Sequence, residues 1–193
     1  SGTWLSEFGR DNTLGHIVRY LSDILVSAPS IVIGVFVYLV MVKPMGHFSG
    51  WAGAVSLAII MLPVVSRTTE EMLKLVPHEL REAALALGAP YWKIMPQVIY
   101  RAAAAGMMTG IMLAVARVAG ETAPLLFTVM NSPYWMESMN EPMGNLTVTL
   151  FNYAMSPYDD WQQLAWGAAF LITMAVLATT IITRLVLHKR SRH

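Results

Sequence analysis

Long apolar stretches dominate the chain and predict helices that cross a membrane. Three windows contain no Asp, Glu, Lys or Arg: residues 24–42, 44–66 and 161–183. Each is close to or above the length of about 20 apolar residues that a bilayer requires. A fourth window, 102–130, is equally apolar but contains Arg117 and Glu121. The pattern predicts an all-α, polytopic transmembrane bundle with about four spans, forming one domain over residues 1–193.

The composition agrees with a membrane protein. Hydrophobic residues make up 55% of the chain and charged residues 13%, against roughly 25% charged residues in soluble domains. The first residues, "SGTWLSEFGR", lack an initiating Met and the basic-then-apolar pattern of a signal peptide. We therefore expect that the first helices of the protein lie outside this sequence. The chain has no cysteine, which excludes disulfides and thiol chemistry.

The distribution of positive charge predicts which connections face the cytoplasm. If the windows cross alternately, one side receives the chain start, the connection 66–101 and the tail. That side carries eleven Lys and Arg residues: Arg10, Arg19, Arg67, Lys74, Arg81, Lys93, Arg101, Arg184, Lys189, Arg190 and Arg192. The other side carries Lys43 alone, and Arg117 lies inside a window. Because cytoplasmic loops are enriched in Lys and Arg, this count places the first side in the cytoplasm.

The connection 122–160 is then expected on the external side. It contains no Lys or Arg. Its four carboxylates are Glu137, Glu141, Asp159 and Asp160. Its aromatic side chains suit the headgroup region of a bilayer. Within it, "NLTVTLFNYAMSP" fits a short helix with Leu146, Thr149, Leu150 and Tyr153 on one face, or an ordered loop, equally well.

The cytoplasmic connection contains a short helix with a break, within residues 78–97. Leu80, Ala83, Ala84 and Leu87 follow the spacing of one helix face. Glu79 and Glu82 lie in its first turns, where negative charge is favourable.

Gly88 is expected to end this helix, and Pro90 fits the first position of a second one. Tyr91, Trp92 and Ile94 would form a bulky apolar end before Pro96 starts the next span. These residues alone allow either a partner-binding helix–turn–helix or an interfacial helix that only closes a loop.

Arg117 and Glu121 are the second candidate feature. Arg117 lies about 20 Å or more beyond Ala102 along a helix, and ionisable residues at such depth usually line an interior pathway. Their spacing of four residues allows them to pair with each other. Gly120 and Pro124 weaken the helix there, as in transporters whose broken helices expose backbone groups to a solute. The alternatives are a structural ion pair or a pair at the outer interface.

Other patterns are less informative. The 14 Met residues show no metal-ligand clustering and are typical of adaptable packing, and no metal site is expected. Small residues between Ala102 and Ala114 would let neighbouring helices approach closely.

The broken helix carries a resemblance to a known family. The stretch "EAALALGAPYWKIMPQVI" resembles the EAA signature of ATP-binding-cassette importer permeases, in which Gly follows the second Ala by four residues. "GMMTGIMLAVARVAGETAPLLFT" is similar to a span of the phosphate-transport permeases of that class. "LSDILVSAPSIVIGVFVY" and "LFNYAMSPYDDWQQLAWGAAF" are similar to other segments of the same permeases.

The resemblance implies the type I importer permease fold and a place in the bacterial inner membrane. It implies that the EAA element docks into a groove on a separate ATPase subunit, with four residues in the coupling role: Glu82, Ala83, Ala84 and Gly88. It also implies that "RVAGETAP" lines the phosphate path, which assigns Arg117, Glu121 and Thr122 to the substrate.

The resemblance further implies several partners: a homologous permease subunit, ATPase subunits, an external phosphate-binding protein and the lipid bilayer, but no nucleic acid. The chain has no G-x-x-x-x-G-K-[ST] loop. ATP and Mg are therefore expected on the ATPase, and this chain is not expected to be an enzyme.

One position departs from the family pattern. Family members commonly have Leu-Pro where this chain has Tyr100-Arg101, which leaves open the angle at which the next span begins. Three alternatives remain for the function: a permease for another oxyanion, a passive anion channel, and a membrane enzyme that uses Arg117 and Glu121. The EAA stretch argues against the last two, because neither needs a helix that docks on a motor.

Overall fold

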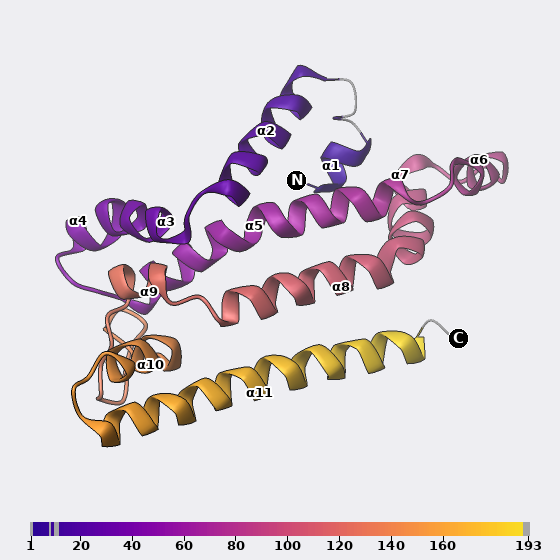
Figure 1. The fold of residues 1–193 in the computed structure, drawn as a ribbon. Coiled ribbons are helices and arrows are strands. Elements are labelled where there is room, and N and C mark those ends of the chain that lie inside the picture. The colour runs from indigo at the N-terminus through magenta and orange to yellow at the C-terminus, as the bar shows by residue number, and fades with distance from the viewer. Residues whose placement is uncertain (1, 8, 10–11, 191–193) are drawn as a thin grey trace. The chain divides into compact units, whose positions relative to one another are not determined.

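The computed structural model describes residues 2–7, 9 and 12–190, which are helices and connections without a strand (Figure 1). The first helices are α1 (Gly2–Glu7), α2 (Thr13–Ser27), α3 (Ser30–Val37), the π-helical turn η1 (Tyr38–Val42), α4 (Lys43–Met45) and α5 (Gly50–Lys74). They are followed by α6 (His78–Ala86), α7 (Tyr91–Ile94), the π-helical turn η2 (Met95–Ile99), α8 (Tyr100–Ala119), α9 (Ala123–Thr128), α10 (Leu146–Ala154) and α11 (Asp159–Arg190). Several residues of the charge count lie outside this description, wholly or by their side chains: Arg10, Arg184, Lys189, Arg190 and Arg192.

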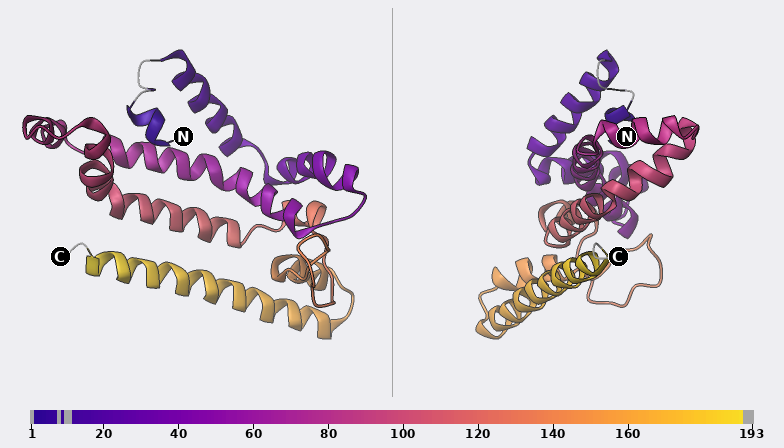
Figure 2. Two further views of the ribbon diagram at one scale, coloured as in Figure 1. Left: turned by 180° about the vertical axis from the view of Figure 1, so that it is seen from behind. Right: turned by 90° about the vertical axis from the view of Figure 1, so that its right-hand side faces the viewer.

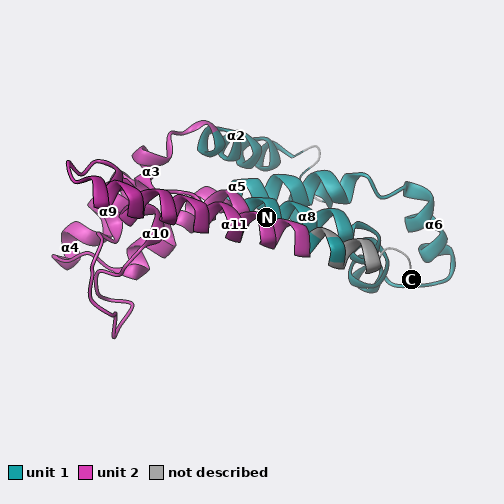
Figure 3. Cartoon of the chain, turned by 60° about the horizontal axis from the view of Figure 1, so that its bottom comes forward, with its two compact units in different colours: residues 1–26, 62–114, 183–193 teal, residues 27–61, 115–182 magenta. Residues whose placement is uncertain are grey.

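The chain divides into two compact units (Figure 3). Unit 1 comprises residues 1–26, 62–114 and 183–193, and unit 2 comprises residues 27–61 and 115–182. The long helices α5 and α8 each contribute residues to both units. Unit 1 contains the broken helix within residues 78–97, and unit 2 contains Arg117 and Glu121.

Three stretches of the described chain are long and apolar enough to cross a membrane: Gly50–Lys74, Tyr91–Ala119 and Asp159–Thr183. This confirms the predicted all-α polytopic fold. The apolar window 24–42 is not one continuous helix, because α2 ends at Ser27 and α3 starts after Pro29. Proline disfavours helical geometry in the residue before it and has no N–H to donate. A fourth span exists only if α2 and the helices after it together form one broken crossing.

The span that follows α6 starts earlier than the sequence indicates. The helix is continuous from Tyr91 through η2 into α8, so Pro96 lies inside it and does not start it. The π-helical turn accommodates Pro96, since its wider turn relieves the clash between the proline ring and the carbonyl of the preceding turn. Tyr91 and Trp92 therefore belong to the first turn of the span.

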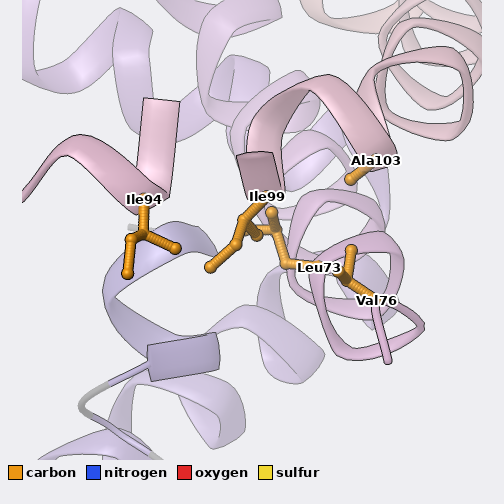
Figure 4. Close-up of a cluster of buried hydrophobic side chains, with 5 residues drawn as sticks. All are labelled: Leu73, Val76, Ile94, Ile99 and Ala103. Atoms are coloured by element: carbon orange, nitrogen blue, oxygen red, sulfur yellow. The ribbon is translucent and has the colours of Figure 1, made fainter. Parts of the chain in front are cut away.

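Unit 1 has a small apolar core where α5 ends and the next span begins. Figure 4 shows its members, which are Leu73, Val76, Ile94, Ile99 and Ala103. Glycine allows α5 and α8 to approach closely, as the small residues of α8 predict. A Cβ atom on Gly110 would lie 2.1 Å from the side chain of Thr68, and one on Gly106 would lie 2.2 Å from that of Met72.

The core of unit 2 forms around α9. Leu125 of α9 and Val129, the residue after α9, are buried together with Val148 of α10. Pro124 packs directly on Gly34 of α3, where a Cβ atom would lie 2.6 Å from the proline Cα. The short helix α9 is thus fixed by neighbours on both α3 and α10.

Candidate coupling element and substrate path

Helix α6 ends in a Schellman motif centred on Gly88. Gly88 has φ of 77°, in the left-handed region that glycine adopts without steric cost. Its N–H donates to the Leu85 carbonyl at 2.9 Å, and the Ala89 N–H donates to the Ala84 carbonyl at 3.2 Å. These are the two hydrogen bonds of the motif. The predicted end of the helix at Gly88 is confirmed. Pro90 is the N-cap residue of α7, directly before its first residue, Tyr91.

Helix α6 presents most of its surface to the outside of unit 1. None of its residues is fully buried, and Glu82 and Ala83 are exposed. The predicted apolar face is divided, because Ala84 packs against the small core while Leu80 and Leu87 are exposed. In Figures 1 and 2, α6 lies past the end of α5, within the connection to the span that starts at Tyr91.

Large apolar side chains gather around this turn without cover from unit 1. Leu85 is 50% exposed, Leu87 88% and Trp92 71%. Several large apolar groups exposed within a short stretch of chain are typical of a protein–protein contact surface. The surface comprises Leu85, Leu87 and Trp92 around the glycine of the motif, and we call it the apolar tip.

One carboxylate accepts hydrogen bonds from residues on both sides of the turn at Gly88. Glu7 of α1 accepts hydrogen bonds from Arg81 of α6, at 2.5 and 2.7 Å, and from the hydroxyl of Tyr91, at 2.5 Å. The pattern along the sequence does not reveal this contact, because Glu7 and Arg81 are 74 positions apart. Arg81 was counted in the sequence only as a cytoplasmic positive charge.

Other cytoplasmic charges are also paired in unit 1. Glu70 accepts from Arg19 at 2.8 Å and from Lys74 at 2.6 Å, and Arg67 donates to Asp23 at 2.7 Å. Lys and Arg residues that pair with carboxylates still count when the cytoplasmic side is predicted from positive charge, since acidic residues contribute little to the orientation of a membrane protein.

The second candidate feature lies in unit 2, where α8 ends. The helix stops at Ala119, and the chain turns through Gly120 before α9 starts at Ala123. Arg117 is exposed, while Glu121 and Thr122 are half-buried. Because Glu121 lies beyond the helix end, its spacing from Arg117 is no longer that of helix neighbours. Within the described residues no ion pair joins the two, so the pairing that the spacing allows is not formed.

The break is held by backbone contacts. The Glu121 N–H donates to the Val118 carbonyl at 3.1 Å, and the Glu121 carbonyl accepts from the hydroxyl of Thr147 at 3.1 Å. Thr122 occupies the N-cap position of α9 without a side-chain cap. The break therefore places Arg117 and Glu121 on a short, fixed segment.

The depth of Arg117 follows from the length of its helix. A span of 29 residues is about 43 Å long at 1.5 Å per residue, which exceeds the roughly 30 Å thickness of the hydrocarbon layer. Arg117 is two residues from the helix end, and so it lies toward the end of the span remote from α6.

The connection before α10 folds over the start of α5. The N–H groups of Gly50 and Trp51 donate to the carbonyls of Glu141 and Met139, each at 3.2 Å. The "NLTVTLFNYA" stretch forms the helix α10, which decides between the predicted helix and loop. Its buried residues are Thr147 and Val148. Among the described residues no group of His, Asp or Glu could hold a metal ion.

The chain is similar to known proteins over most of its length. Residues 1–192 match the family described as binding-protein-dependent transport system inner membrane component. The chain is 50% identical to the phosphate transport system permease protein PstA of Yersinia pestis over 98% of the chain and 64% of that protein. It is 53% identical to PstA of Haemophilus influenzae over 98% of the chain and 68% of that protein.

A more distant relative and a solved structure agree with these matches. The chain is 37% identical to the probable PstA of Methanocaldococcus jannaschii, over 97% of the chain and 66% of that protein. A chain in the inward-facing structures of the MetNI methionine ABC transporter superposes with a TM-score of 0.80. That match has 18% sequence identity and covers 97% of this chain and 83% of the other, and it establishes the fold. This chain spans about two thirds of the length of the curated relatives above.

Proposed function

Because the chain belongs to the family of binding-protein-dependent transport system inner membrane components, we propose that it is the permease subunit of an ATP-driven importer of inorganic phosphate. The observation that carries this proposal is the 53% identity to the phosphate permease of Haemophilus influenzae over 98% of the chain. In this proposal the chain forms part of the translocation path. A permease for another oxyanion and a passive anion channel are the alternatives.

The coupling role is assigned to α6 and the turn after it. Glu82, Ala83, Ala84 and Gly88 would form the docking element, and the apolar tip would insert into a groove on the ATPase subunit. The exposure of Leu87 and Trp92 supports this assignment, because an apolar surface of that kind is stabilised when a partner covers it. The helix continues directly from Tyr91 into α8, which offers a rigid route from the ATPase to the substrate path.

The substrate role is assigned to Arg117, Glu121 and Thr122. A guanidinium presents a planar fork of N–H donors that matches two phosphate oxygens. Arg117 is exposed and has no ion-pair partner among the described residues, so its donors are available. Glu121 would accept a hydrogen bond from a phosphate hydroxyl, which sulfate lacks. The Thr122 hydroxyl adds a donor beside them.

The remaining parts of the importer are proposed on separate chains. ATP and Mg would bind the ATPase subunits, since this chain has no phosphate-binding loop. A homologous permease would complete the path, and an external binding protein would deliver phosphate.

The proposal is tested by uptake in bacterial cells whose own phosphate permease has been deleted. Expression of the full-length protein with its transport partners should restore uptake of radiolabelled phosphate, and excess sulfate should not compete. Uptake of sulfate or molybdate in place of phosphate would support the oxyanion alternative. No restored uptake, despite the protein being present in the membrane, would refute the proposal.

A further inference from the structure

The short helix α1 is firmly attached to the rest of unit 1. Leu5 and Ser6 are buried, and the Leu5 carbonyl accepts a hydrogen bond from Arg19 at 3.0 Å. The Thr3 hydroxyl accepts from the Tyr100 hydroxyl at 3.0 Å. A Cβ atom on Gly2 would lie 2.6 Å from the carbonyl oxygen of Ser66. These contacts fix α1 on α2, α5 and α8.

Glu7, the last residue of α1, has a nearly inaccessible carboxylate. Its side chain is 2% exposed, and that of its partner Arg81 is 15% exposed. Arg81 reaches both carboxylate oxygens and also donates to the Leu73 carbonyl at 3.2 Å. A charge buried to this extent is tolerated only when it is paired, and loss of one partner leaves the other uncompensated.

Arg81 and Tyr91, which both donate hydrogen bonds to Glu7, lie on opposite sides of the turn at Gly88. Arg81 precedes Gly88 on α6, and Tyr91 follows it as the first residue of the span. The two Schellman hydrogen bonds, from Gly88 and Ala89, close the end of α6 and do not extend to Tyr91. Helix α6 has no fully buried residue, and Ala84 packs on the small core. The hydrogen bonds of Arg81 and Tyr91 to Glu7 therefore join the two sides of the turn from outside it.

We propose that Glu7 is a positioning residue of the coupling element: it fixes α6 relative to the helix that starts at Tyr91. The three residues Glu7, Arg81 and Tyr91 form what we call the Glu7 clamp. With the clamp in place, a displacement of α6 moves the span as a rigid body. Without it, the turn at Gly88 bends and the displacement is lost. This inference rests on the proposed coupling role of α6.

The test uses the complete transporter reconstituted in liposomes. Glu7→Gln keeps the side-chain size but removes the charge and replaces one accepting oxygen with a donor. We expect the ATPase to remain bound and ATP hydrolysis to continue, while phosphate imported per ATP falls roughly tenfold, because the buried Arg81 loses its counter-charge. Glu71→Gln is the matched control, because it removes an exposed ion pair, with Arg67, whose side chains are 57% and 56% exposed.

A spectroscopic measurement separates positioning from general destabilisation. The chain has no cysteine, so spin labels at Glu79→Cys and Met108→Cys report the distance between α6 and α8. Glu7→Gln should broaden this distance distribution, and Glu71→Gln should leave it narrow. Wild-type coupling and a narrow distribution in Glu7→Gln would overturn the inference.

Two further outcomes keep the test decisive. If Glu7→Gln does not reach the membrane, Tyr91→Phe removes one hydrogen bond of the clamp and keeps the ion pair. Partial broadening in Tyr91→Phe supports the clamp, and an unchanged distribution contradicts it. If the ATPase does not bind the unmodified chain, the proposed function fails, while the label distances still decide whether Glu7 positions α6.

Discussion

The hydroxyl of Thr147 in α10 donates a hydrogen bond to the backbone carbonyl of Glu121, 3.1 Å away. This contact joins α10 to the break between α8 and α9, which carries the residues assigned to the substrate. The same hydroxyl lies 2.7 Å from the side-chain oxygen of Asn145, and its single proton serves one acceptor at a time. Thr147 is 6% exposed, so water does not readily replace it.

Thr147→Val should loosen the break while preserving the packing of the side chain. Loss of the donor removes this part-buried hydrogen bond, which contributes about 0.5–1.5 kcal/mol. We expect a lower melting temperature of the purified protein and slower phosphate uptake. Thr147→Ser retains the hydroxyl and is the control. A valine variant with wild-type stability and uptake would show that the contact is dispensable.

The packing of α3 on α9 gives a second prediction. Gly34→Ala would place a Cβ atom 2.6 Å from Pro124 Cα, a backbone atom that cannot move aside. We expect α3 and α9 to separate and the protein to lose stability by about 1–3 kcal/mol, the usual cost of overpacking. Gly167→Ala, in α11, meets no atom within 4 Å and should be neutral or slightly stabilising. Thermal unfolding of both variants in detergent distinguishes the two positions, and equal melting temperatures would contradict the packing.

The turn after α6 predicts a loss of coupling. Gly88→Pro cannot adopt the observed φ of 77° and should uncouple ATP hydrolysis from transport while the protein stays in the membrane. Glu82→Lys, on the exposed side of α6, should have the same effect by reversing a charge on the docking surface. Gly88→Asn is the control, because asparagine tolerates the left-handed region. Wild-type uptake in both Gly88→Pro and Glu82→Lys would remove α6 from the coupling role.

Arg117 and Glu121 are expected to act on the substrate in different ways. Arg117→Lys keeps the charge but loses the planar fork, and most transport should be lost. Arg101→Lys, the same change near the other end of α8, should transport normally. Glu121→Gln should retain some uptake and discriminate less against sulfate. Competition uptake with surface expression checked measures both effects, and normal transport by Arg117→Lys would make Arg117 a structural residue.

The topology is tested with single cysteines in this cysteine-free chain. Leu75 is 72% exposed in the turn before α6, and Asn140 is exposed in the connection before α10. An impermeant thiol reagent added to intact cells should label Asn140→Cys and leave Leu75→Cys unmodified. The opposite labelling pattern would reverse the assigned sides.

Local features of the fold were predictable from the sequence. Apolar windows locate the long helices, and Gly88 ends α6 as its type predicts, because glycine has no steric cost at positive φ. The exact start of the span at Tyr91 was not predictable. A proline is typical of the start of a helix, and Pro96 can lie inside the span only because a π-helical turn accommodates it. Pro29 marks a weak point in the window 24–42, but the sequence does not show that the chain bends there, because neighbouring helices can satisfy the backbone groups that a proline frees.

Contacts between distant positions could not be predicted. Glu7 and Arg81 are 74 residues apart, and neither has a feature that selects the other among the remaining charges. Arg117 and Glu121 show the opposite error, because their helical spacing allows a pair that the end of α8 at Ala119 prevents. Spacing is informative only while the helix continues, and α8 ends at Ala119, before Glu121.

We propose that this chain carries phosphate across the membrane at the expense of ATP hydrolysed by a partner. The direct measurement reconstitutes the full-length protein with its permease partner, its ATPase and the external binding protein in liposomes. Radiolabelled phosphate inside and ATP hydrolysed are then followed together. We predict that phosphate accumulates above its external concentration only when ATP and the binding protein are both present. Phosphate that equilibrates without ATP, and never exceeds the external concentration, would identify a passive channel and contradict the account.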